Sequence, residues 1–169
     1  MSEENDQPGT FLTFKLNDET YGLTIDRVRE IVECDSAITP VPRTPSFMRG
    51  VMNLRGNVVP VVDMNRKLDL PPTEPTPDTC IIILEIGAEE ETLVLGVLVD
   101  GVEEVLELSA EDLLVAPPAG TSLRPEFLSG MAKTESGDFI MMVEIDAVLS
   151  PGELAPGAER AAAAAQPQP

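Results

Sequence analysis

Short apolar runs separated by turn residues recur along the whole chain. Runs such as IIIL (81–84) and VVPVV (58–62) are apolar at nearly every position. Strands of this kind are covered on both faces or close into a small barrel. LND, RGN, GAEEE and ESGD are typical turn sequences between such runs. The pattern predicts a mainly β protein, with brief helical turns at DRVREI and PSFMRG that Asp26 and Ser46 could cap.

The same pattern occurs twice. YGLTIDRVREIV (21–32) aligns in constant register with LGVLVDGVEEVL (95–106), so that Gly22 matches Gly96 and Asp26 matches Asp100. Flanking segments also match in order, namely LTFKL with IILEI, FMRG with FLSG, and VPVVDMNRKL with IMMVEIDAVL. We infer an internal duplication of one unit, and we expect two small β-barrels of about five strands each.

The duplication divides the chain. The first repeat is expected at about residues 10–69 and the second at about 80–150, joined by a Pro-rich linker at 70–79. Residues 1–9 are polar, and residues 151–169 are rich in Ala and Pro with no apolar face to bury. We expect both ends to be flexible.

Composition excludes several classes of function. The net charge of −19 argues against binding to nucleic acid or to anionic membrane surfaces, and no apolar run is long enough for a membrane span. The chain has no histidine, which removes the commonest general base and zinc ligand. Phosphate-binding and nucleophile motifs are absent. We therefore expect no enzyme activity, no cofactor and no metal. A barrel that senses a small molecule is an alternative, and it would need a cavity with convergent polar groups.

Two arginines lie in the otherwise mostly apolar stretch FMRGVMNLRGNVVPVVD (47–63). Gly56 followed by Asn57 predicts a hairpin turn, because both residues tolerate positive φ. Arg55 precedes this turn, and it is either a solvated arginine or a partly covered one. A partly covered guanidinium needs a partner, for which Glu30 is the best candidate. Arg49 has Ser129 as its counterpart in the second repeat and is interpreted as a solvated charge.

These segments resemble the CheW-like domain family of bacterial chemotaxis coupling proteins. The resemblance runs from about residue 10 to residue 150, and Gly-Val-x-Asn-Leu-Arg-Gly-x-Val-x-Pro-Val-x-Asp (50–63) is its most specific part. It implies two intertwined five-stranded barrels of SH3-like type. It also implies a non-catalytic, cytoplasmic adaptor, monomeric in isolation, that is recruited to membrane receptor arrays. There it would couple the cytoplasmic tips of chemoreceptors to the regulatory domain of the histidine kinase CheA. The alternative is a paralogue that serves another pathway, such as surface motility or development.

The resemblance also assigns roles to residues. A groove between the subdomains would hold the receptor tip by helix-in-groove contacts, with Val28, Glu30, Ile31, Arg55, Val99, Val102 and Val105 as the matching positions. Core packing is the competing interpretation for one or two of the five apolar positions. Kinase contacts would involve Leu113, Leu114, Val115 and Pro117, in an apolar segment where related proteins can carry a basic residue. Turns would be shaped by Gly50, Gly56, Gly96 and Gly130.

Overall fold

The computed structural model describes residues 9–17, 19–33, 38–71, 74–88, 91–109, 112–114, 127–133, 137 and 139–149. The first half contains β1 (Gly9–Leu16), β2 (Glu19–Thr24), the 3-10 turn η2 (Ile25–Arg27), β3 (Val28–Glu33), β4 (Met48–Leu54), β5 (Asn57–Asp63) and α1 (Met64–Lys67). The second half contains β6 (Cys80–Ala88), β7 (Glu91–Val99), β8 (Gly101–Leu108), β9 (Leu113–Leu114), β10 (Leu128–Lys133), β11 (Phe139–Val143) and α2 (Ile145–Val148).

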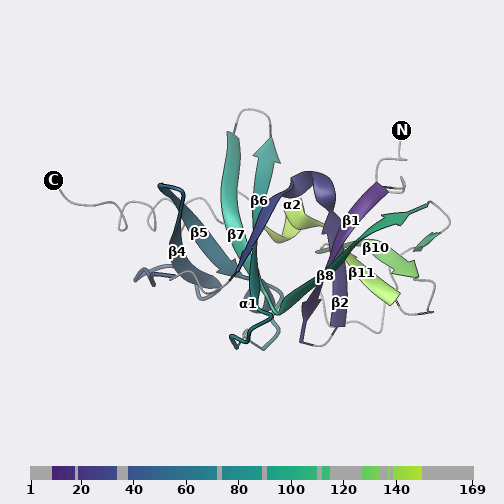
Figure 1. Cartoon of the computed structure of the whole chain (residues 1–169), viewed down its shortest axis with the longest axis horizontal. Coiled ribbons are helices and arrows are strands. Elements are labelled where there is room, and N and C mark those ends of the chain that lie inside the picture. The colour runs from purple at the N-terminus through teal and green to yellow at the C-terminus, as the bar shows by residue number, and fades with distance from the viewer. Residues whose placement is uncertain are drawn as a thin grey trace.

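The strands form two sheets, and each sheet draws on both halves of the chain (Figure 1). One sheet has the order β8-β1-β2-β11-β10-β9, and the other has the order β3-β6-β7-β5-β4. The β1–β2 hairpin therefore pairs with strands of the second half, while the β6–β7 hairpin pairs with strands of the first half. The predicted mainly β, intertwined architecture is confirmed. Each sheet contains strands of both sequence repeats, because the repeats exchange their first hairpins, so a repeat does not correspond to one subdomain.

Equivalent contacts in the two halves reveal a pseudo-twofold relation. β3 pairs with β6 as β8 pairs with β1, and β5 lies parallel to β7 as β11 lies parallel to β2. The amide of Asp63 donates to the carbonyl of Phe47 at 2.8 Å, and the amide of Glu144 donates to that of Phe127 at 2.8 Å. The alignment of FMRG with FLSG therefore reflects equivalent places in the fold.

Three clusters of buried side chains explain the continuous apolar runs. The largest lies between the sheets, and a smaller cluster lies on the opposite side of each sheet. In β6, Ile82 and Leu84 enter the core between the sheets, while Ile81 and Ile83 enter the smaller one. That smaller cluster also takes side chains from β3 and β4, which lie at opposite ends of the strand order. The sheet must therefore curl on itself.

The helical turns agree only in part with the sequence prediction. DRVREI contains only the end of the short η2 turn before β3 begins at Val28, and the last three residues of PSFMRG belong to β4. Among the described residues, the α-helices are α1 and α2, of four residues each. Asp63 caps α1, since its Oδ1 accepts from the amide of Asn65 at 3.1 Å. In the part of the chain that the structure describes, no helix has the length and apolar character to cross a membrane.

Gly96 is not a turn residue. It lies inside β7, between Ile83 of β6 and Val61 of β5, and a Cβ there would come within 2.6 Å of Ile81 Cγ2. Its counterpart Gly22 lies inside β2, where the nearest atom to a Cβ would be the flexible end of Met142 at 3.1 Å. Gly96 is therefore needed for close packing inside the barrel.

Replacement of these two glycines tests that role. We expect Gly96→Ala to lower the free energy of unfolding by about 2 kcal/mol, because the branched Ile81 side chain must shift within a filled core. Gly22→Ala should cost about 1 kcal/mol, because the thioether end of Met142 can move. Urea unfolding of both variants measures the difference, and equal losses would contradict the packing argument.

Candidate docking surface

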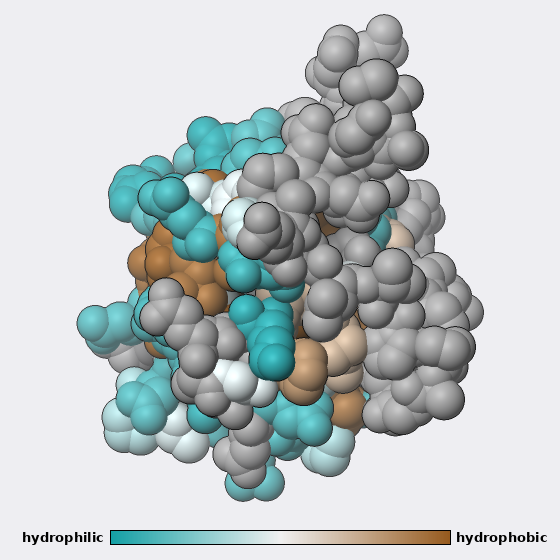
Figure 2. All heavy atoms as spheres, turned by 90° about the vertical axis from the view of Figure 1, so that its right-hand side faces the viewer, coloured by the Kyte–Doolittle hydropathy of each residue, from teal (hydrophilic) through white to brown (hydrophobic). Residues whose placement is uncertain are grey.

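Among the described residues, three large apolar side chains are exposed, namely Ile31 at 42%, Val105 at 53% and Phe139 at 52%. Ile31 lies on β3 and Val105 on β8, which are edge strands of the two sheets. Figure 2 views the end that carries β8, β10 and β11 and shows apolar surface bordered by hydrophilic residues. Ile31 and Val105 are also counterparts in the duplication, so the same exposure occurs twice at equivalent places.

Strand register places four of the predicted residues on one face. Val28 and Ile31 lie opposite Leu84 and Ile82 of β6. Val102 and Val105 lie opposite Phe14 and Leu12 of β1. These four partners all belong to the core between the sheets, and directly opposed residues of an antiparallel pair share a face. Val28, Ile31, Val102 and Val105 therefore all lie on the sides of β3 and β8 that face the core between the sheets, and we call these four residues the β3/β8 face.

Two β-bulges make this arrangement possible. Strict alternation would place residues three apart on opposite faces of a strand. The register of β3 shifts between Val28 and Glu30, and that of β8 shifts beside Glu103 and Glu104. Each bulge inserts one residue, so the valine before it shares a face with the apolar residue after it. Val28 and Val102 are partly buried against the core, whereas Ile31 and Val105 protrude.

A cleft of about 900 Å³ lies at one end of the β3/β8 face. Glu33 at the end of β3 and Val102 near the start of β8 both line it, which brings the two edge strands together there. Most of its charged lining residues are acidic, namely Glu33, Glu74, Asp78, Asp100 and Glu103 against Lys15. No group of three or more potential metal ligands was found among the described residues.

Val99 does not belong to this surface. Its side chain is fully buried in the core between the sheets. It ends β7, which is covered by β6 on one side and β5 on the other. Core packing, the competing interpretation for some of the predicted valines, is the correct one for Val99.

Arg55 and Glu30 form the predicted pair. Nη1 of Arg55 donates to Glu30 Oε2 at 2.6 Å, and Nη2 donates to Oε1 at 2.7 Å, a bidentate geometry. The turn itself is shifted by one residue, because Arg55 (φ 53°) and Gly56 (φ 87°) occupy it and Asn57 begins β5. Positive φ at both central residues is the signature of a type I′ hairpin, which usually takes Asn or Asp where Arg55 stands.

The pair lies on the other side of β3 from Ile31. Glu30 is opposite Ile83, which belongs to the small cluster inside the curled sheet. Arg55 follows β4, at the far end of the strand order from β3. The pair therefore ties the two ends of the sheet together. It supports the β3/β8 face from behind, instead of lining it as predicted.

The pair also changes the pKa of the Glu30 carboxyl group. Hydrogen bonds from Arg55 hold the pKa of Glu30 below its ordinary value. Because the folded pKa is the lower one, the contribution of the pair to stability is present above the ordinary carboxyl pKa and is lost as pH falls through the folded value. We expect Arg55→Gln to raise the pKa of Glu30, as measured by NMR of the side-chain carboxyl.

Asp112 supplies the control for this titration. Its pKa is lowered by hydrogen bonds from Ser109, far from Arg55 in sequence. It should therefore keep its value in the Arg55→Gln variant. A Glu30 pKa that stays in place, or an equal change at Asp112, would contradict the assigned pair.

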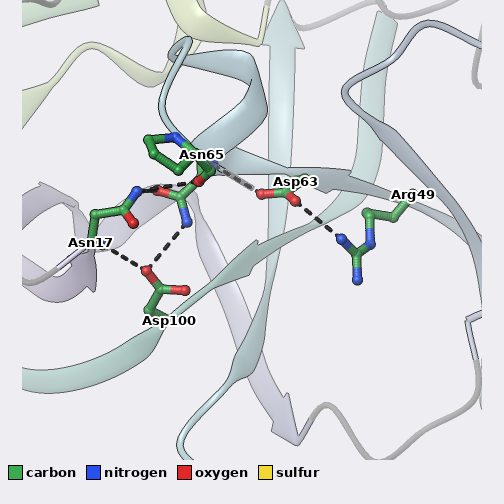
Figure 3. Close-up of polar contacts among 6 residues, drawn as sticks. Asn17, Arg49, Asp63, Asn65 and Asp100 are labelled. Carbon is green, nitrogen blue, oxygen red and sulfur yellow. Dashed lines mark hydrogen bonds and ion pairs between the residues drawn. The ribbon is translucent and has the colours of Figure 1, made fainter. Parts of the chain in front are cut away.

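Arg49 is not a solvated charge, as the sequence suggested. Its Nη1 lies 3.3 Å from Oδ2 of Asp63, whose side chain is fully buried (Figure 3). A buried carboxylate needs such a partner. Asn65 and Asn17 continue the network to Asp100. Oδ2 of Asp100 accepts from Asn65 Nδ2 at 3.2 Å and from the backbone N–H of Asn17 at 2.6 Å. The network fixes the residue that precedes β8.

Lys67 is a structural residue that the sequence did not point out. Its side chain is 9% exposed, and Nζ lies 5.0 Å from the ring centre of Phe47 and 5.5 Å from that of Phe127. Cation–π attraction of this kind strengthens when water is excluded. The two phenylalanines are counterparts in the duplication, so Lys67 joins the halves. The phenylalanine repeated in FMRG and FLSG was the one feature of the sequence that could have pointed to this contact. Lys67 itself could not be picked out, because it aligns with Val148 and has no basic counterpart in the second repeat.

The remaining predicted residues lie on the second sheet or at bends. Leu113 and Leu114 form β9, which pairs with β10 at the end of its sheet, while Val115 and Pro117 lie outside the described residues. Gly50 and Gly130 lie at equivalent bulges of β4 and β10 instead of in turns. Gly56 shapes a turn as predicted, and Gly137 (φ 94°) adopts a similar conformation in the second half.

Comparison with known proteins agrees with this fold. A family model described as the CheW-like domain matches residues 10–153. The chain belongs to the CheW family. It is 37% identical to the chemotaxis protein CheW of Klebsiella aerogenes over 86% of this chain and 84% of that protein. It is also 32% identical to protein FrzA of Myxococcus xanthus, over 73% of each.

A solved structure supports the same assignment. The crystal structure of the scaffolding protein TtCheW from Thermoanaerobacter tengcongensis superimposes with a TM-score of 0.74 at 33% identity. The match covers 85% of this chain and 94% of that one. The fold is therefore that of a CheW-type scaffold protein.

Proposed function

We propose that the chain is a non-catalytic adaptor that couples the cytoplasmic tips of chemoreceptors to the regulatory domain of the histidine kinase CheA. The observation that carries the proposal is the β3/β8 face, where the two halves present equivalent apolar side chains from the edge strands of the described sheets. Membership of the CheW family and similarity to a protein described as a scaffold support it.

The receptor tip would dock on the β3/β8 face. Ile31 and Val105 protrude, while Val28 and Val102 supply a partly buried base. An amphipathic helix binds such a surface through apolar side chains three and four residues apart. Because both walls carry the same pattern, the face suits an antiparallel helical hairpin, which also presents two similar helices. Glu30 and Arg55 would act indirectly, by holding β3 in position.

The kinase would bind at a different place, so that the adaptor can hold both partners. The segment with Leu113, Leu114, Val115 and Pro117 is the proposed contact. Its described part, β9, ends the larger sheet, and exposed sheet edges are common sites of protein association. Such a complex would form in the cytoplasm, at membrane receptor arrays. The alternative, a paralogue for another pathway, differs only in which receptor and kinase are bound.

A reconstitution tests the proposal. Receptor cytoplasmic fragments and the CheA kinase of the same organism are mixed with and without the chain, and kinase autophosphorylation is followed. We expect the chain to co-sediment with each partner, and receptor control of the kinase to require the chain. Failure to bind either partner would overturn the adaptor function. Capture of a different receptor–kinase pair from the native organism would favour the alternative.

A further inference from the structure

Two glutamates that form no ion pair with any described residue lie at matching positions beside the apolar residues of the β3/β8 face. VREIVE (28–33) and VEEVLE (102–107) align in the duplication, so Glu33 and Glu107 are counterparts. Each follows a protruding apolar residue by two positions, Ile31 in β3 and Val105 in β8, and residues two apart on a strand share a face. Glu33 lies opposite Cys80, which packs against the core between the sheets. Both glutamates are exposed.

The other acids of these strands are already paired or face away. Glu30 holds Arg55, and Glu103 lies 3.8 Å from Lys15 Nζ and accepts from Thr20 Oγ1 at 3.1 Å. Glu104 lies opposite Thr13, on the face of β8 that also carries the inward-packed Leu106. No described residue forms an ion pair or side-chain hydrogen bond with Glu33 or Glu107. Their charges therefore remain uncompensated on the proposed docking surface.

The two carboxylates lie at the C-terminal ends of the two edge strands, Glu33 in β3 and Glu107 in β8. Glu33 ends β3 and shares its cleft with Val102 near the start of β8. From the pseudo-twofold relation, we expect Glu107 to lie towards the start of β3 in the same way. The partner therefore meets negative charge at both ends of an apolar centre.

We propose that Glu33 and Glu107 determine partner specificity, by selecting a helical segment whose apolar patch is flanked by Lys or Arg at both ends. This inference rests on the proposed function. Charges at the rim of an interface steer association and penalise partners of the wrong sign more than they add affinity. Flanking acidic residues on a competing helix would meet like charge at each end, in a chain whose net charge is already −19.

The test uses the full chain and a purified helical-hairpin fragment of a chemoreceptor tip from the same organism. Affinity is measured at low and at high salt for Glu33→Gln, Glu107→Gln and Glu104→Gln. The last is the matched control, since it removes the same charge from the same strand as Glu107 but from the other face. We expect the first two variants to bind about two- to five-fold more weakly at low salt, with a reduced salt dependence, and the control to bind as the wild type does.

The outcomes separate the two proposals. No binding by the wild-type chain would overturn the adaptor function, and this inference with it. Wild-type binding with unchanged or tighter binding by Glu33→Gln and Glu107→Gln would overturn the inference alone. An equal loss in Glu104→Gln would also overturn it, because the effect would then come from net charge. Restoration of affinity when Glu107→Lys is combined with a Lys→Glu change in the receptor flank would support direct pairing.

Discussion

Gly50→Ala is expected to lower the free energy of unfolding by about 4 kcal/mol, the largest loss of any single substitution considered for this protein. Gly50 has φ of 144°, a conformation that residues with a Cβ rarely adopt. A Cβ would lie 2.1 Å from the carbonyl oxygen of Thr39. That carbonyl accepts from the Val51 amide at 2.9 Å, and the Thr39 amide donates to Val51 at 2.8 Å. Relief of the clash would break this bridge.

Gly56→Ala is the control for this prediction. Gly56 also has positive φ, but no atom lies within 4 Å of the position that a Cβ would occupy. It should lose only about 1 kcal/mol, from backbone strain. Chemical denaturation of both variants isolates the contribution of the clash. Similar losses for Gly50→Ala and Gly56→Ala would show that the approach of residue 39 to β4 does not constrain the hairpin.

The double variant Ile31→Asp/Val105→Asp is expected to lose at least about a hundred-fold in affinity for the receptor tip. The physical reason is that two protruding apolar side chains at the centre of the face become charges that docking would bury without partners. Both positions are exposed on edge strands, so stability should change little. Titration with receptor fragment, together with a thermal unfolding curve, measures both effects.

Phe139→Asp provides the matched control for receptor binding. Phe139 is as exposed as Val105, but it lies on β11, away from the β3 and β8 edges. The same change from apolar to acidic should leave receptor affinity unchanged there. A loss of affinity in Phe139→Asp comparable to that in the double variant would show that receptor binding does not depend specifically on the β3/β8 face.

The class of fold and the duplication could be predicted from the sequence, because both depend on local patterns. Apolar runs mark strands, and the match between residues 21–32 and 95–106 survives in the register of β3 and β8. The pairing of Arg55 with Glu30 could also be predicted, but the Arg55 side chain is 71% exposed and not partly covered as the sequence suggested. The exchange of hairpins between halves rests on the family resemblance instead, because pairing between distant strands leaves no local signal.

Which side chains share a face could not be read from the sequence. Strict alternation along β3 would place Val28 on the same face as Glu30 and on the opposite face from Ile31. The bulge at Arg29 instead places Val28 on the same face as Ile31 and opposite to Glu30. The same shift in β8 joins Val102 to Val105. The family resemblance grouped Arg55 and Glu30 with the docking valines, whereas the bulge places Glu30 on the opposite side of β3 from Ile31. The burial of Val99 could not be predicted, because it depends on the strands that pair with β7 on both sides. The pairing of Arg49 could not be predicted either, because only the fold brings Asp63 beside it.

The receptor tip is proposed to dock on the face formed by Val28, Ile31, Val102 and Val105. The most direct test is NMR of the methyl groups of the full chain during titration with the receptor fragment. We predict that the Ile31 and Val105 methyl signals shift most, those of Val28 and Val102 shift less, and those inside the curled sheets, such as Ile81 and Ile140, stay in place. Unchanged Ile31 and Val105 signals at saturation, with shifts confined to another surface, would contradict the claim.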